Sequence, residues 1–199
     1  MGVLQKNARR DFALRSYYQD NGAGQGRLKT LLSWGVDIVA VITLALFAVM
    51  MFGTKITMSG RSMEPTLQTG DVVLLDKLWY NFSKPKRMDV VAFQNMGDDT
   101  KTYIKRIVGL PGETIQIQGG KLYVNGKEAE LGEKAGAIAL PGLAETAVEL
   151  KKDEYFVLGD NPETSEDSRF ANVGNVHISQ IKGKLWLRMS PFSRFGFIK

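Results

Sequence analysis

The sequence has no cysteine, and it has a single histidine, His177. Without cysteine there is no disulfide and no thiol nucleophile, so a domain outside the cytoplasm must be stable through its own core. With one histidine the usual Cys-His and Ser-His pairs are nearly excluded, a zinc site is not expected, and no cofactor is indicated. A serine activated by a neutral lysine remains available to this chain.

The sequence also has little net charge. The formal net charge is +5, from 26 Lys and Arg against 21 Asp and Glu, and nucleic-acid binding is not expected. The charges before residue 31 are mostly basic: Lys6, Arg9, Arg10, Arg15, Arg27 and Lys29, against Asp11 and Asp20. We interpret residues 1–30 as a solvated basic tail, and basic residues beside a membrane span favour the cytoplasmic side.

A continuous apolar stretch, residues 31–53, follows this tail. It is long enough to cross a hydrocarbon core of ~30 Å at 1.5 Å per residue. Its only charge, Asp37, lies near the basic end, where a carboxylate can reach lipid headgroups at low cost. A cleaved secretory peptide would have a shorter apolar region, and a buried core helix would have a polar face. We predict one uncleaved transmembrane helix, with its N-terminus cytoplasmic and residues 54–199 outside.

Beyond residue 54 the pattern changes to short apolar runs between turn residues, which predict β-strands. The expected strands are residues 72–75, 90–93, 102–108, 114–118, 121–124, 155–158 and 184–189. Asn125-Gly126 predicts a tight hairpin turn. Residues 129–149 read as a loop-rich insertion with one weak strand. The predicted fold class is therefore mainly β, a β-rich domain preceded by one transmembrane α-helix.

The first candidate for chemistry is Ser62, in the segment SGRSMEPTL at residues 59–67. Pro65 makes the preceding Glu64 extended or turn-like, so this segment can hold a hydroxyl clear of a β scaffold. A serine must lose its proton to a neighbouring base as it attacks. The alternative interpretation is an ordinary turn serine.

The second candidate is Lys105, in the run YIKRIVGLPG at residues 103–112. Alternation along a strand puts Lys105 and Tyr103 on one face, and we expect that Arg106, on the opposite face, can stay in water. A lysine that points into an apolar site loses solvation, so its pKa falls and its neutral amine can accept a proton. The alternative is a pair of solvated cations on an edge strand.

The third candidate is the segment GDNPETSEDSR at residues 159–169. Asp167 and Arg169 are two residues apart, so they can share a strand face or pair across a turn through a charge-assisted hydrogen bond. Ser165 carries a hydroxyl that can orient a neutral amine. Taken alone, the segment is equally an acidic surface turn.

In this order the three segments resemble the type I (leader) signal peptidases, in their small Gram-positive-like form. The resemblance runs from residue 31 almost to the end, including GDVVLLDK and GKLWLRMSPFSRFG. It implies a serine endopeptidase of the bacterial cell membrane that removes signal peptides from exported preproteins, cutting after small residues at −3 and −1. It implies Ser62 as nucleophile, Lys105 as general base, Ser165 as the hydroxyl that positions Lys105, and Asp167 and Arg169 as an ion pair that shapes the site.

The same resemblance implies how the partners bind. The preprotein segment would lie extended along a sheet edge, and the lipid bilayer would hold the anchor. The sequence does not reveal whether accessory subunits take part. The residues that match the pocket lining are Met58, Met63, Leu67, Tyr103 and Ile104, for which core packing is the alternative role.

Departures from the family pattern lie outside the serine and the lysine. The resemblance implies that the Ser62 backbone N–H holds the oxyanion. Gly60 replaces a hydroxyl residue of many Gram-negative members, which leaves either a single donor or an unidentified second one. Pro162 stands where arginine is common, and Met88 where glycine is common.

Two other functions remain open at this point. A self-cleaving domain like those of LexA-type repressors shares the Ser-Lys logic, although the apolar span and the lack of a DNA-binding helix pair argue against it. A catalytically silent membrane protein that retains signal peptides is the other.

Overall fold

The computed structural model describes residues 29–47, 53–95, 98–131 and 136–198. The chain divides into two units, Met1–Phe52 and Gly53–Lys199. Residues 1–28 of the predicted basic tail lie outside the described residues.

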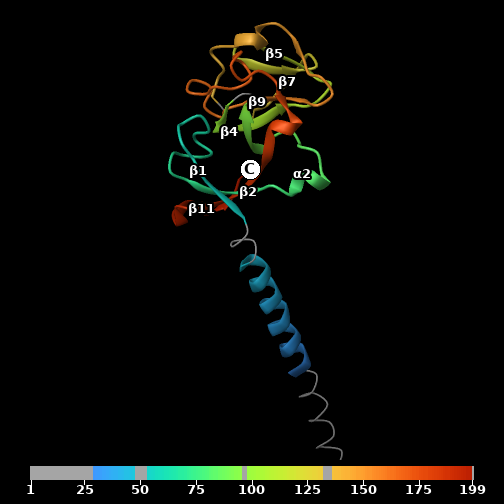
Figure 1. Ribbon diagram of the computed structural model, residues 1–199, viewed down its shortest axis with the longest axis vertical. Helices are drawn as coiled ribbons and strands as arrows, with labels where there is room; N and C mark the ends of the chain where they lie inside the picture. The colour runs from blue at the N-terminus through green and yellow to red at the C-terminus, as the bar shows by residue number, and fades with distance from the viewer. Residues whose placement is uncertain (1–28, 48–52, 96–97, 132–135, 199) are drawn as a thin grey trace, which may run out of the picture. The chain divides into compact units, whose positions relative to one another are not determined.

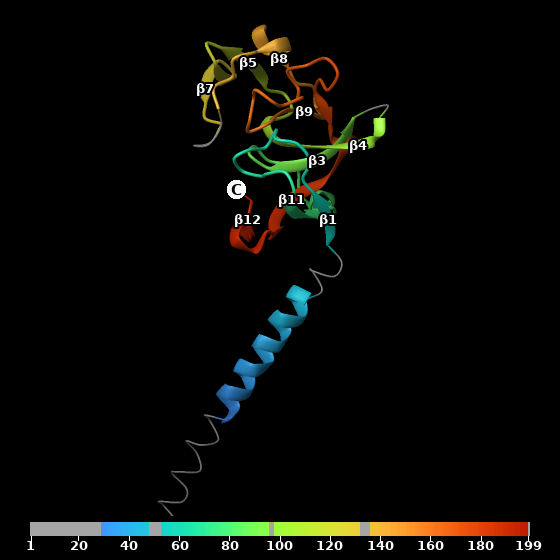
Figure 2. The same ribbon diagram turned by 90° about the vertical axis from the view of Figure 1, so that its left-hand side faces the viewer.

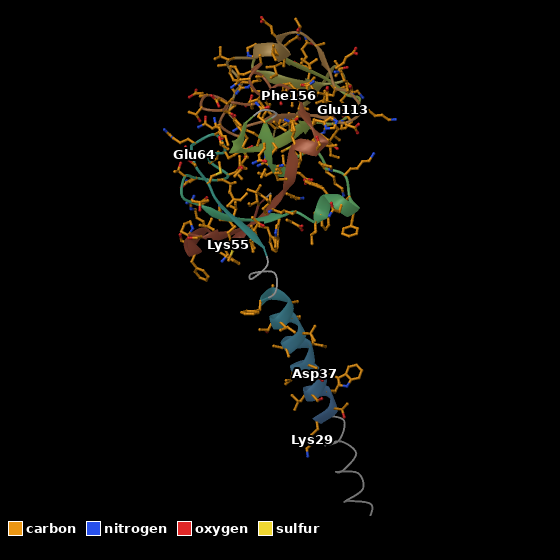
Figure 3. All side chains as sticks on the ribbon, viewed as in Figure 1. Lys29, Asp37, Lys55, Glu64, Glu113 and Phe156 are labelled. Carbon is orange, nitrogen blue, oxygen red and sulfur yellow. The ribbon has the colours of Figure 1, made fainter. Side chains whose placement is uncertain are left out.

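A single helix, Lys29–Phe47, is what the structure describes of the first unit. Its 19 residues have a mean hydropathy of 2.0, so the helix is long and apolar enough to cross a membrane. Side chains project from all around it, including the labelled Lys29 and Asp37 (Figure 3), and all of them are exposed. The helix begins two residues before the predicted start, and residues 48–52 of the predicted span lie outside the described residues.

The second unit is mainly β, as predicted. Its strands are β1 (Thr54–Thr57), β2 (Val72–Asp76), β3 (Val90–Asn95), β4 (Asp98–Gly109), β5 (Thr114–Gln118), β6 (Lys121–Val124), β7 (Lys127–Ala129), β8 (Val148–Glu149), β9 (Glu154–Leu158), β10 (Val176–His177), β11 (Ile181–Ser190) and β12 (Gly196–Phe197). The helical segments are single turns: α2 (Trp79–Phe82) and the 3-10 turns η1 (Gly142–Glu145), η2 (Ile178–Gln180) and η3 (Phe192–Arg194).

The strands form two antiparallel sheets. The eight-stranded sheet has the order β1-β2-β11-β3-β4-β9-β10, with β12 beside β11, and the four-stranded sheet has the order β7-β6-β5-β8. Figures 1 and 2 show β5 and β7 at one end of this unit and β1 and β11 at the other.

The large sheet is packed on both faces around β3 and β4. Alternate residues of β3 enter two different apolar clusters. Val90 and Ala92 belong to one cluster, and Val91 and Phe93 belong to the other. Burying a large apolar side chain contributes about 1.5–3 kcal/mol, so this double packing fixes the central strands firmly. A third cluster, which includes Ile115 and Leu122, fills the space under the small sheet.

The expected strands are all confirmed, and the Asn125-Gly126 turn lies between β6 and β7 with positive φ at both residues. The weakly patterned stretch contains η1 and β8. The sequence did not predict β1, β7, β10 or β12 as strands, and these have two to four residues each. Met88, in place of the expected glycine, has a φ of 73°, which glycine adopts without the strain that a Cβ introduces.

Candidate active site

Ser62 and Lys105 meet although 43 residues separate them. Ser62 lies in the loop between β1 and β2, and Lys105 in the middle of β4. The Lys105 Nζ donates a hydrogen bond to the Ser62 Oγ at 2.8 Å. Ser62 is half-buried, so its hydroxyl is in contact with the lysine and still open to a ligand.

The surroundings of Lys105 remove its amine from water. The residue is 4% exposed, and its Nζ lies 5.9 Å from the centre of the Tyr103 ring, on the shared face that the sequence predicted. Burial lowers the pKa of Lys105 from 10.5 to about 8, against the opposing fields of Asp167 and Glu166. A substantial fraction of the amine is therefore neutral at a pH near 8.

The segment 159–169 packs against the loop between β1 and β2 that carries Ser62, which we call the serine loop. The Asn161 backbone N–H donates to the Ser62 carbonyl at 3.0 Å. A Cβ on Gly159 would lie 2.5 Å from that carbonyl oxygen and 2.3 Å from the Ser165 Oγ, so only glycine permits this approach. The close packing brings the third candidate segment against the first.

Asp167 and Arg169 form a fully buried ion pair, which their spacing allowed and the family resemblance implied. The Arg169 Nε donates to Asp167 Oδ1 at 2.8 Å and its Nη2 to Oδ2 at 3.0 Å. The Asp167 carboxylate also accepts the Gly159 backbone N–H, while Arg169 donates to the carbonyls of Leu140 and Pro162. The pair thus connects the 159–169 segment to the chain that leads into η1.

Ser165 is buried in the same place, but its hydroxyl makes no hydrogen bond to the described residues. An added Cβ on Gly159 would meet both the Ser165 Oγ and the Ser62 carbonyl oxygen, so Ser165 lies near the serine that it is expected to assist, and no hydrogen bond joins its hydroxyl to Lys105. A buried hydroxyl without a partner is free to bond to the lysine amine.

Arg106 is not in water, which corrects the sequence-based prediction. It is 4% exposed, and it makes a bidentate ion pair with the buried Asp160, at 2.8 Å from Nε to Oδ1 and 2.7 Å from Nη2 to Oδ2. Its Nη1 donates to the Met88 carbonyl. The prediction failed because β4 is central in a sheet covered on both faces, so both sides of the strand are buried.

Arginines from the C-terminal segment also hold the serine loop. The Arg188 Nη1 donates to the Thr66 carbonyl at 2.9 Å, and the Arg194 Nη2 donates to the fully buried Asp71 at 2.6 Å. Asp71 in turn accepts the Gln68 backbone N–H. The sequence offered no local signal for the two arginine contacts, because each joins positions more than 100 residues apart.

A cleft of about 490 Å³ opens at the Ser62 and Lys105 pair. One wall is residues 56–62, at the end of β1 and beyond, and the other is residues 101–105 of β4, with Thr164 and Glu166 completing it. Residues 101–105 pair with β3 along one edge, and no described strand pairs with their other edge. An extended peptide can add to this free edge through main-chain hydrogen bonds.

The expected pocket residues divide into two groups. Met58, Tyr103 and Ile104 line the cleft. Met63 and Leu67 do not line it, because both are fully buried in the apolar cluster that also contains Met58 and Ile104. Their contribution is to pack behind the cleft wall.

Comparisons with known proteins identify the family of this chain. Residues 31–190 match the family described as signal peptidase, peptidase S26. The chain is 33% identical to signal peptidase IB of Staphylococcus aureus strain MRSA252, over 85% of this chain and 94% of the relative. It is 34% identical to signal peptidase I of Bacillus caldolyticus, over 82% and 92% of the two chains. A crystal structure of a signal peptidase I from Enterococcus faecalis V583 is 27% identical and superposes with a TM-score of 0.39, covering 52% of this chain and 97% of that one.

Proposed function

Because this chain belongs to the signal peptidase family, peptidase S26, we propose that it is a serine endopeptidase that removes N-terminal signal peptides with Ser62 as nucleophile and Lys105 as general base. The observation that carries this assignment is the 2.8 Å contact between the Lys105 Nζ and the Ser62 Oγ at a buried amine. Direct contact and a lowered amine pKa are the two properties that a lysine base requires.

In the first half of the reaction the neutral Lys105 amine takes the hydroxyl proton as the Ser62 Oγ attacks the carbonyl carbon before the cut. The Ser62 backbone N–H stabilises the oxyanion of the tetrahedral intermediate. The Lys105 ammonium then gives its proton to the leaving amine, the C–N bond breaks, and the signal peptide remains as an ester on Ser62.

In the second half a water molecule gives a proton to Lys105 and attacks the ester. The intermediate collapses, the Ser62 Oγ recovers a proton from Lys105, and the signal peptide leaves with a free carboxylate. Lys105 thus serves as base and acid in alternation, a contribution of about 10²–10⁴-fold for one positioned group. Ser165 positions the Lys105 amine, and Asp167 and Arg169 hold the segment that carries Ser165.

The substrate lies extended between the two walls of the cleft at Ser62 and Lys105, which we call the first cleft. Its main chain adds to the free edge of residues 101–105, and its small side chains at −3 and −1 contact Met58, Tyr103 and Ile104. Large side chains are rejected because the cleft is lined by closely packed side chains.

Family membership and the apolar helix Lys29–Phe47 together indicate a membrane-anchored protein. We assign the basic residues before the helix to the cytoplasm and the β-rich unit to the outside of the bacterial cell membrane. This orientation puts the serine and the lysine on the side where exported preproteins emerge.

A cleavage assay on a preprotein, with the full chain in detergent micelles, tests the assignment. Ser62→Ala and Lys105→Ala should each abolish cleavage while the β-sheet circular dichroism stays unchanged. Lys127→Ala, which changes an exposed lysine of the small sheet, should retain it. Near-normal turnover by either active-site variant would refute the dyad. Internal fragments formed without any preprotein would support the self-cleaving alternative, and an inactive wild type that retains signal peptides would support the silent one.

A further inference from the structure

A second cleft lies beside the serine loop. Its volume is about 360 Å³, and its lining is Glu64, Pro65, Gly136, Ala137 and residues 160–163. Within the part of the chain that the structure describes, no residue lines both clefts. Ser62 lines the first cleft, and Glu64, two residues further along the same loop, lines the second.

The second cleft adjoins the residue that carries the nucleophile. Asn161 lines it, and the Asn161 backbone N–H is the group that donates to the Ser62 carbonyl at 3.0 Å. The rings of Pro65 and Pro162 give it apolar walls. A peptide that passes Ser62 and leaves the first cleft therefore has a hollow in which to continue.

The two clefts differ in charge. The first is lined by the cations Arg61 and Lys101, by the Lys105 amine and by one carboxylate, Glu166. The second is lined by three carboxylates, those of Glu64, Asp160 and Glu163, and by no basic residue among those described.

These carboxylates are not equally neutralised. Asp160 is paired with the buried Arg106. Glu64, labelled on the surface of the β-rich unit in Figure 3, pairs with Arg61, which is largely exposed, and such pairs are weak. Glu163 is exposed and has no ion-pair partner among the described residues. Negative charge therefore remains at the mouth of this cleft.

We propose that the second cleft binds the substrate residues that follow the cut, and that its carboxylates favour a cationic over an anionic side chain there. This inference rests on the proposed function, in which the first cleft takes the residues before the cut. A protease must hold both sides of the scissile bond, and the second cleft adjoins the loop that carries Ser62 without sharing a lining residue with the first cleft. The proline rings suit the aliphatic stem of a lysine or arginine whose charge stays at the mouth.

The test uses the full chain in detergent micelles and two peptides with alanine at −3 and −1. The peptides differ only at the second residue after the cut, which is lysine in one and glutamate in the other. We expect kcat/KM for the lysine peptide to be about tenfold higher, and we expect added salt to reduce this ratio. Glu163→Gln should reduce the ratio to about threefold, and Glu163→Lys should reverse the preference. Glu149→Gln, which removes an exposed carboxylate of β8, should leave the ratio at its wild-type value.

Equal kcat/KM for the two peptides in the wild type, or a ratio unchanged in Glu163→Lys, would overturn this inference and leave the proposed function standing. Failure of the wild type to cut either peptide, or any preprotein, would overturn the proposed function itself.

Discussion

The Arg106 guanidinium and the Asp160 carboxylate form a bidentate pair in which each side chain is about 5% exposed. Arg106 directly follows Lys105 on the same strand. Arg106 comes from β4 and Asp160 from the segment that contacts Ser62. Breaking a buried pair leaves an uncompensated charge, so Asp160→Asn should lower the free energy of unfolding by about 3–5 kcal/mol. Urea denaturation of the full chain in micelles measures this loss.

The exposed pair Lys101–Glu166 is the matched control, because its side chains are about half exposed. Lys101→Gln should cost about 0–1 kcal/mol. Replacing both buried partners, Arg106→Met with Asp160→Leu, should cost less than Asp160→Asn alone, since no unpaired charge remains. Equal losses for Asp160→Asn and Lys101→Gln would contradict this account of the pair.

Lys105→Met should make the protein more stable and inactive. Burial lowers the pKa of Lys105 to about 8 in the folded chain, so at neutral pH the fold holds a charge that the unfolded chain solvates better. The difference from 10.5 corresponds to about 3 kcal/mol of lost stability, present in full below pH 8 and regained as the pH rises from 8 to 10.5. We expect a gain of about 1–3 kcal/mol at pH 6.5 that shrinks toward pH 10. A destabilised Lys105→Met at pH 6.5 would contradict a buried, desolvated amine.

More of the fold than of the candidate site could be predicted from the sequence. The longer strands are apolar runs between turn residues, and that pattern is local, so β2, β3, β5, β6 and β9 were found. Short, half-exposed strands such as β1 carry no such pattern, since pairing with β2 rather than composition determines them.

At the site the spacing allowed the Asp167–Arg169 pair, and alternation along the strand predicted the shared face of Tyr103 and Lys105. It could not predict that Arg106 is buried, because the second face of β4 is covered by chain that lies far away in the sequence. The pairing of Arg194 with Asp71 was hidden for the same reason. Alternation gives the face of a residue and does not reveal what packs on that face.

Gly142→Ala tests the connection between the Asp167–Arg169 pair and η1. A Cβ at this position would lie 2.3 Å from the Arg169 carbonyl oxygen, and the Gly142 φ of +57° already disfavours a side chain. Gly126→Ala is the matched control, since φ is +75° there but no atom lies within 4 Å of the added Cβ. Gly126→Ala should cost about 1 kcal/mol from backbone strain. Gly142→Ala should lower the free energy of unfolding by more than this and should also lower kcat. Equal losses for the two variants would show that the close approach of Gly142 to the Arg169 carbonyl does not hold Arg169 in place.

Ser165→Ala separates a positioning role from a structural one. The Ser165 hydroxyl is buried without a hydrogen-bond partner among the described residues, so its removal should leave the free energy of unfolding unchanged or raise it by up to about 1 kcal/mol. If the hydroxyl orients the Lys105 amine during turnover, kcat should fall by about 10–100-fold. Ser165→Thr, which keeps the hydroxyl, should recover part of the loss. A variant with both normal stability and normal kcat would exclude the positioning role.

The dependence of kcat/KM on pH tests the central claim most directly, because only the neutral Lys105 amine can take the Ser62 proton. With a Lys105 pKa of about 8, kcat/KM for a preprotein should rise with pH and level off above pH 8–9. At pH 6 it should be about a hundredfold below the plateau. A profile that is flat from pH 6 to 9, or that falls as the pH rises through 8, would contradict a neutral lysine base at position 105.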